Sequence, residues 1–157
     1  EPFIVSAMGS HGGGTEEGQR EVLAGYGITE ERLGVPVVTT VDTVYLGNCA
    51  NGRPVWFDRA AYEADLIVPI NRVKLHTDFV GSIQSGLCKM LVIGLGNHKG
   101  CSAVHVEAPE VFADAIEETA RLILQKAPVG FGIAILENAY DKTYAVEAVP
   151  AEHLVER

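Results

Sequence analysis

The chain has 157 residues, 47% of them hydrophobic, and a formal net charge of −9 at pH 7. Its length and apolar content suit one compact domain with a sizeable core. The negative charge argues against nucleic acid or an anionic membrane surface as a partner, and no apolar run is long enough to cross a membrane.

The N-terminal region is predicted to contain an apolar strand over 3–7, a glycine-rich loop and a helix. Thr15 suits the N-cap of that helix, because two glutamates follow in its first turn, where the macrodipole favours acids. Glycines flank His11 in the loop and leave room for backbone or ligand to approach this histidine. His11 is therefore a candidate acid/base or ligand, with a solvated histidine as the alternative.

A strand over 35–40 and a β-hairpin over 43–58 come next. The dipeptide Asn51-Gly52 is suited to a primed turn between the arms of the hairpin. Tyr45 and Trp56 are interpreted as a cross-strand packing pair.

A short helix over 59–64 and a strand over 65–70 lead into a polar group that contains Arg72, Lys74 and His76. In α/β sheets, ligands bind in the loops that leave the carboxyl ends of strands. We therefore predict a functional site that starts directly after this strand.

Residues 82–94 have helical apolar spacing and enclose Lys89, which has no acid four residues away. A buried lysine is costly unless it is paired, deprotonated or covalently used, and the alternative is a side chain that extends to solvent. The following GLGNHKG is a weak match to a nucleotide-binding fingerprint, and we interpret 96–100, with His98, as a tight turn.

After His105 the sequence predicts a long amphipathic helix that begins near Pro109, strands over 129–136 and 143–149, and a terminal helical turn with a surface His153. Strands that alternate with helices indicate an α/β fold with a mixed or mostly parallel sheet, flanked by helices and carrying a β-hairpin excursion.

The three cysteines, Cys49, Cys88 and Cys101, fit neither a disulfide framework nor a C-x-x-C metal site, and we expect buried reduced thiols in a cytoplasmic protein. No G-x-S-x-G, H-E-x-x-H or Walker A motif is present. The remaining candidates are the loop histidines and Lys89. Two histidines at separate strand ends would suit opposed acid/base roles, and a third histidine with the lysine would suit a metal or a covalently held cofactor.

Two segments, AMGSHGGGTEEGQREVL and NRVKLHTDFVGSIQSGLCK, resemble the nickel-dependent lactate racemase (LarA-like) family in its N-terminal domain. The resemblance implies that His11 and His76 are the two catalytic acid/bases. It implies that Lys89 covalently holds a nickel pincer nucleotide, nickel-pyridinium-3,5-bisthiocarboxylic acid mononucleotide. His105, sixteen residues after Lys89, matches the nickel ligand of the family, and His98 is the alternative.

The function that this resemblance implies is a racemase or epimerase, an isomerase that acts on lactate or a related 2-hydroxy acid by hydride transfer to the tethered cofactor. Arg72 and Lys74 flank the site and are predicted to bind the cofactor. The departures are the interval of thirteen residues from His76 to Lys89, which is longer than in the family, and the glycines after His11. They indicate a divergent homologue with an unassigned substrate.

Residues 1–157 are predicted to be one domain, a fragment of the N-terminal catalytic domain of such a protein, whose C-terminal domain is a missing partner. We expect this piece alone to be weakly active or inactive. The alternatives are a non-catalytic binding module and an enzyme of the same fold with another cofactor, such as an iron–sulfur or nucleotide group.

Overall fold

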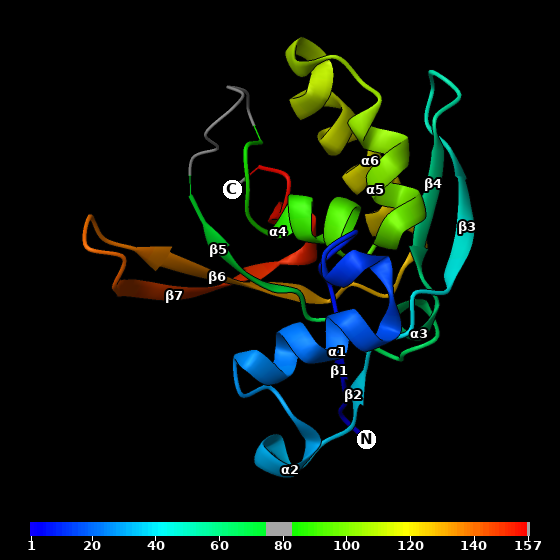
Figure 1. Ribbon diagram of the computed structural model, residues 1–157. Coiled ribbons are helices and arrows are strands. Elements are labelled where there is room, and N and C mark those ends of the chain that lie inside the picture. The colour runs from blue at the N-terminus through cyan, green and yellow to red at the C-terminus, as the bar shows by residue number, and fades with distance from the viewer. Residues whose placement is uncertain (75–82, 157) are drawn as a thin grey trace.

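The computed structural model describes residues 1–74 and 83–156, and it places the predicted elements in three small groups of strands around a set of helices (Figure 1). The N-terminal group is a parallel pair, β1 (Ile4–Val5) and β2 (Val37–Val38). Between these strands the chain forms a 3-10 turn and two helices: η1 (Gly12–Gly14), α1 (Glu16–Gly25) and α2 (Glu30–Leu33). Thr15 caps α1 as predicted, because its hydroxyl accepts from the backbone N–H of Gly18 at 3.2 Å.

The predicted hairpin is confirmed as β3 (Thr43–Asn48) and β4 (Pro54–Asp58), an antiparallel pair. Tyr45 lies opposite Trp56, and their ring centroids are 5.3 Å apart. The primed turn was wrong: Asn51 does not have a positive φ, and only Gly52 does, at 87°. The N–H of Gly52 donates to Cys49 O at 2.9 Å, so the connection is a longer loop built on a four-residue turn.

The third group is a mixed sheet with the order β5–β6–β7, formed by β5 (Ile70–Val73), β6 (Phe131–Glu137) and β7 (Thr143–Pro150). β5 and β6 are parallel, whereas β6 and β7 are antiparallel. The α/β class with a mixed sheet and a hairpin is therefore confirmed, although the strands do not join into one sheet.

The predicted strand over 65–70 lies later than expected. Only Ile67 forms an isolated bridge, to Val129, and the strand itself begins at Ile70 after α3 (Arg59–Tyr62). Pairing with β6 sets this register, so Asn71 and Arg72 belong to the strand rather than to a loop after it.

A run of helices connects β5 to β6: α4 (Leu87–Lys89), the π-helical turn η2 (Met90–Gly94), α5 (Asn97–His105), the 3-10 turn η3 (Pro109–Val111) and α6 (Phe112–Lys126). A last 3-10 turn, η4 (Ala151–His153), follows β7, and His153 is exposed there. The tight turn expected over 96–100 was wrong, because these residues form the start of α5.

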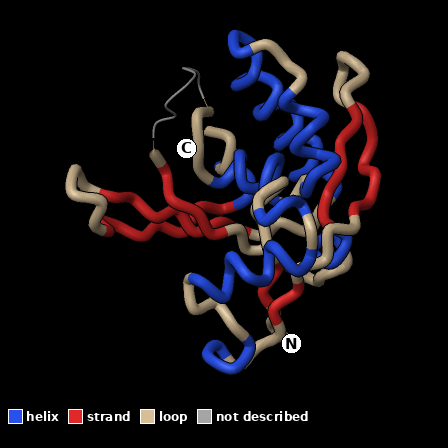
Figure 2. The backbone as a smooth tube through the Cα atoms, in the orientation of Figure 1, coloured by secondary structure: helices blue, strands red, loops and turns tan. Residues whose placement is uncertain are grey.

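The core lies where α4, η2 and α6 pack between the hairpin and the three-stranded sheet (Figure 2). Its fully buried side chains include Phe57, Leu91, Ile116 and Ile123. Ile116 and Ile123 are seven residues apart on the apolar face of α6, the spacing that predicted this helix. The core therefore fixes the helical run that carries Lys89 and the α5 histidines.

All three cysteines are buried and free, as expected. Within residues 1–74 and 83–156, no helix combines the length and the apolar character needed to cross a bilayer.

Candidate functional site

His11 lies in the loop that leaves β1, and its side chain is exposed. Its backbone N–H donates to Met8 O at 3.0 Å, and its carbonyl accepts from Gly14 N at 3.2 Å. Gly12, Gly13 and Gly14 all have positive φ, a conformation that side-chain-bearing residues adopt only with strain. The glycines therefore form the tight turn that follows His11, and the side chain of His11 is left on the surface.

The His11 loop is anchored on the helical run through Gly9. The N–H of Gly9 donates to Gly94 O at 3.0 Å, and a Cβ added at Gly9 would lie 2.9 Å from Ile93 O. The φ of Gly9 is +59°, so both its conformation and the space around it require glycine.

The same loop then follows α5. Ser10 Oγ lies 3.8 Å from Cys101 Sγ, and a Cβ added at Gly14 would lie 3.6 Å from His98 Cβ. The fold thus brings the His11 loop beside a helix that carries two further histidines, although about ninety residues separate them in sequence.

Gln19 holds this loop from the opposite side. Its side chain is fully buried in α1, accepts from Ser6 Oγ at 2.6 Å and donates to Gly9 O at 3.1 Å. Sequence reasoning missed this residue, because a glutamine inside a helix has no pattern that separates it from a surface residue.

His98 and His105 are both exposed and lie seven residues apart on α5. Two helical turns separate them, which places them on one face of the helix at about 10.5 Å along its axis. Only residues three or four apart are neighbours on a helix surface, so the two imidazoles are separate candidate ligands.

The imidazole of His105 contacts the preceding turn of its own helix. Its Nδ1 lies 2.7 Å from the carbonyl oxygen of Cys101 and 3.4 Å from Cys101 Sγ. A carbonyl oxygen can only accept, so the short contact requires Nδ1 to carry the proton. In the neutral imidazole Nε2 then carries the lone pair, and the edge-on contact with Phe112, at 5.2 Å between ring centroids, restricts the orientation of the ring. Nε2 is therefore the ring nitrogen through which a neutral His105 could act as a ligand.

Lys89 ends α4 and is half-buried, after the buried Cys88 and directly before the π-helical turn. The N–H of Leu95 donates to Met90 O at 2.9 Å, the i→i−5 hydrogen bond of a π-helix. Such turns are rare and occur frequently at functional sites. Burial raises the pKa of the Cys88 thiol to about 11, so this neighbour of Lys89 is a neutral thiol at physiological pH.

The other predicted residues lie around β5. Arg72 forms an ion pair with Glu137 at 3.2 Å, while the neighbouring Asn71 donates to Gly86 O at 3.1 Å. Because successive strand residues point to opposite faces, Arg72 faces away from α4. Lys74 is exposed, and its backbone N–H is 2.8 Å from Ser85 Oγ. Their role in cofactor binding remains a prediction, and His76 lies outside the described residues.

A cavity of about 500 Å³ lies between α4 and the three-stranded sheet. Its lining includes Lys74, Cys88, Ala134 and Leu154, but none of His11, Lys89, His98 and His105. This cavity is therefore separate from the surface that carries the histidines of the His11 loop and α5.

Asp58 and Asn97 fix the start of α5. Both are fully buried, and Asn97 Nδ2 donates to Asp58 Oδ2 at 2.8 Å. Asp58 also caps α3 through Ala61 N, and its own N–H donates to Leu95 O at 2.6 Å. Burial raises the pKa of the Asp58 carboxyl, because desolvation disfavours its charged form more than these hydrogen bonds favour it.

Residues 2–115 match the family model of the lactate racemase N-terminal domain. Among solved structures, the lactate racemase apoprotein from Thermoanaerobacterium thermosaccharolyticum matches with a TM-score of 0.62 and 15% sequence identity. The alignment covers 86% of this chain and 35% of that chain, so the present chain spans about a third of the length of this relative. No curated protein sequence matches.

Proposed function

Because the chain belongs to the lactate racemase N-terminal domain family, which implies an isomerase at family level, we propose that it holds the cofactor of a 2-hydroxy acid racemase. In this proposal Lys89 is the covalent anchor of a nickel pincer nucleotide, His105 is the protein ligand of its metal, and His11 is one of two acid/bases. His76 is the second, and its position is a prediction from sequence.

The observation that carries the proposal is the contact of His105 Nδ1 with the carbonyl oxygen of Cys101. A metal-binding histidine commonly donates its other ring N–H to a carbonyl or carboxylate, which fixes the ring and makes the free nitrogen more basic. The contact of 2.7 Å between His105 Nδ1 and Cys101 O is such an arrangement. It supports His105 over His98 as the ligand.

The single histidine ligand proposed from the chain also fits a metal whose other ligands belong to the cofactor. Among the described residues, no three His, Cys, Asp or Glu side chains converge into a metal-binding group. One imidazole alone would bind nickel weakly, so the remaining donors would come from the sulfur-containing cofactor. When bound, the nickel pincer nucleotide supplies a reversible hydride acceptor.

The chain itself would supply the proton transfers and the placement of the substrate. The exposed His11 would remove the hydroxyl proton of one enantiomer of the 2-hydroxy acid, as an imidazole can near neutral pH. A second base on the opposite side is needed to reprotonate the other enantiomer, which is the role proposed for His76.

Co-expression with the enzymes that synthesise the cofactor tests the proposal. We expect the wild-type chain to gain the mass of the cofactor after denaturation and to contain about one nickel per chain. Lys89→Arg, which keeps the charge but cannot form the thioamide, should gain neither. Lys99→Arg is the matched control, since Lys99 Nζ lies over the Trp56 ring at 4.9 Å and has no proposed role.

A wild-type chain that gains no mass and no nickel would overturn the proposal and favour a non-catalytic binding module. Retention of the added mass by Lys89→Arg would show that another residue is the anchor.

A further inference from the structure

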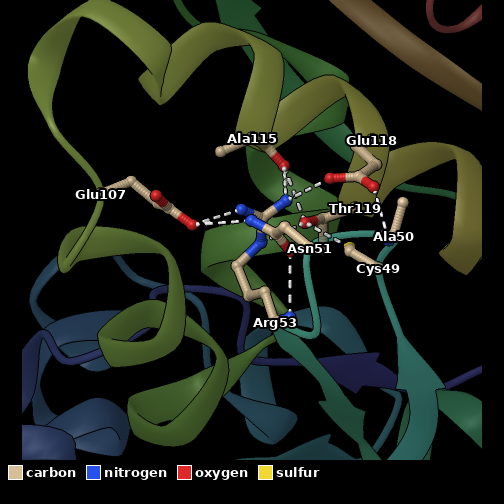
Figure 3. A network of polar contacts seen from close by, with 8 residues as sticks. All are labelled: Cys49, Ala50, Asn51, Arg53, Glu107, Ala115, Glu118 and Thr119. Atoms are coloured by element: carbon tan, nitrogen blue, oxygen red, sulfur yellow. Dashed lines mark hydrogen bonds and ion pairs between the residues drawn. The ribbon is translucent and has the colours of Figure 1, made fainter.

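Arg53 is a buried residue of the hairpin loop, and its guanidinium forms a fork of two ion pairs, to Glu107 after α5 and to Glu118 in α6 (Figure 3). The residue is 7% exposed, and its guanidinium points away from the hairpin toward α6 and the α5–α6 connection. One arm donates to Glu107 Oε1 at 2.5 Å and the other to Glu118 Oε2 at 2.8 Å. Further donations go to Thr119 Oγ1 and Ala115 O, both at 3.3 Å.

Arg53 remains charged at this buried position. Burial, the largest single effect, acts to lower its pKa, but the hydrogen bond and the charge of Glu107, together with the contribution of Cys49, raise the pKa above its ordinary value. A guanidinium with two carboxylates is geometrically specific, because its planar fork fixes the direction of each arm.

The two arms of the fork lead to different places. Glu107 lies two residues after His105, and its N–H donates to Val104 O at 3.1 Å, so it closes the last turn of α5. Its carboxylate also accepts from Asn51 Nδ2 at 3.2 Å. Glu118 lies in α6, and its other oxygen accepts from Ala50 N at 2.7 Å, which fastens the tip of the hairpin.

His105 is the last residue of α5, a position where helices fray. The Nδ1 contact with Cys101 O needs the geometry of this last turn, since the carbonyl belongs to the residue one turn earlier. The contact with Phe112 needs the connection to α6 to stay in place as well. Of the two ion pairs of Arg53, only the one with Glu107 connects the end of α5 to another element.

We infer that Arg53, acting through Glu107, is a positioning residue that fixes the tautomer and the ring orientation of His105. The Glu118 arm of the same fork fastens the hairpin tip and does not act on His105. The inference deepens the proposed function, because it rests on His105 as the metal ligand.

Glu107→Gln and Glu118→Gln are a matched pair, because each removes one carboxylate from the same guanidinium. The readout is the tautomer of His105 in the metal-free chain, from ¹⁵N–¹H correlation of labelled histidines, with the signal assigned by its loss in His105→Ala. We expect wild type and Glu118→Gln to keep the proton on Nδ1, and Glu107→Gln to show a mixture of both tautomers. Both substitutions should lower the midpoint of urea unfolding similarly.

Two shorter variants keep the test independent of the glutamine substitutions. Glu107→Asp retains the charge but withdraws the carboxylate by one methylene, and it should give the same mixture as Glu107→Gln. Glu118→Asp should leave the His105 signal unchanged. If the 107 and 118 variants affect His105 equally, or neither affects it, the fork is only structural and the inference is wrong.

Nickel retention separates this inference from the proposed function. In cofactor-loaded protein, Glu107→Gln should lose nickel to a chelator about 10- to 100-fold faster than Glu118→Gln, the range for partners of metal ligands. Nickel that is retained without His105 overturns the proposed ligand. Nickel that depends on His105 but is lost equally from both variants overturns only the role of Arg53.

Discussion

The ring nitrogen Nδ1 of His105 lies 2.7 Å from the carbonyl oxygen of Cys101, one helical turn earlier in α5. A carbonyl oxygen only accepts, so Nδ1 is the donor in this contact, and in the neutral imidazole Nε2 then carries the lone pair. His98 lies at the other end of the same helix face, so the two histidines can be compared on one scaffold.

The first prediction is that His105→Ala retains less nickel than wild type, because the loss of a ligand should weaken metal binding by at least the roughly tenfold typical of partners that orient ligands. His98→Ala, the control on the same helix, should retain the wild-type nickel content. Elemental analysis of protein purified after co-expression with the cofactor-synthesising enzymes measures both. The opposite result, nickel kept by His105→Ala and lost by His98→Ala, would assign the metal to His98.

The second prediction concerns the loop of His11. Gly9→Ala should destabilise the fold more than Gly13→Ala. Both glycines have positive φ, for which alanine costs about 1–2 kcal/mol, but a Cβ at Gly9 would also lie 2.9 Å from Ile93 O, whereas nothing lies within 4 Å of one at Gly13. The free energies of urea unfolding measure the difference.

Equal losses in the two glycine variants would mean that the loop moves away from η2 at little cost. In that case the Gly9–Gly94 hydrogen bond would not be what holds the His11 loop against the helical run.

Local chemistry made part of this fold predictable. Thr15 followed by two glutamates caps α1, and the apolar spacing of Ile116 and Ile123 defines α6, because each signal depends on neighbours within one or two turns. The Tyr45 and Trp56 pair followed from the alternation of the hairpin arms.

The errors arose where contacts between distant segments decide the structure. Gly96 and Gly100 disfavour a helix locally, yet α5 forms there, because the missing side chain of Gly100 lets the helix approach Trp56 O, where a Cβ would already lie at 3.1 Å. The start of β5 at Ile70 is set by its pairing with Ile133, which 63 residues separate from it.

The sequence named the candidate site residues but not the buried polar residues that hold their segments in place. His11, Lys89, His98 and His105 were named from sequence, but Gln19, Asn97 and Arg53 were not. These three are buried polar residues whose partners come from other elements. No local periodicity identifies such residues, since their burial depends on the complete fold.

The last prediction concerns pH and the start of α5. The pKa of Asp58 is raised in the folded chain, so folded Asp58 holds its proton at pH values where the unfolded chain has released it. Stability from this residue therefore falls as pH rises from the ordinary aspartate range through the raised pKa. Asp58→Asn has no charge to lose and should be free of this decline.

The amide that Asp58→Asn introduces can also form hydrogen bonds with the groups around position 58. Its oxygen would still cap α3, and its NH₂ group can donate to Asn97 Oδ1 after a flip of the Asn97 amide, since that buried oxygen has no hydrogen-bond partner among the described residues. The unfolding free energy of Asp58→Asn minus that of wild type should therefore increase as the pH rises above about pH 4, the ordinary aspartate range. Asp65→Asn, at an exposed carboxyl, is the control and should give a difference that changes little with pH. A difference for Asp58→Asn that stays constant or decreases over this range would show that the folded chain accommodates the charge of Asp58 without cost.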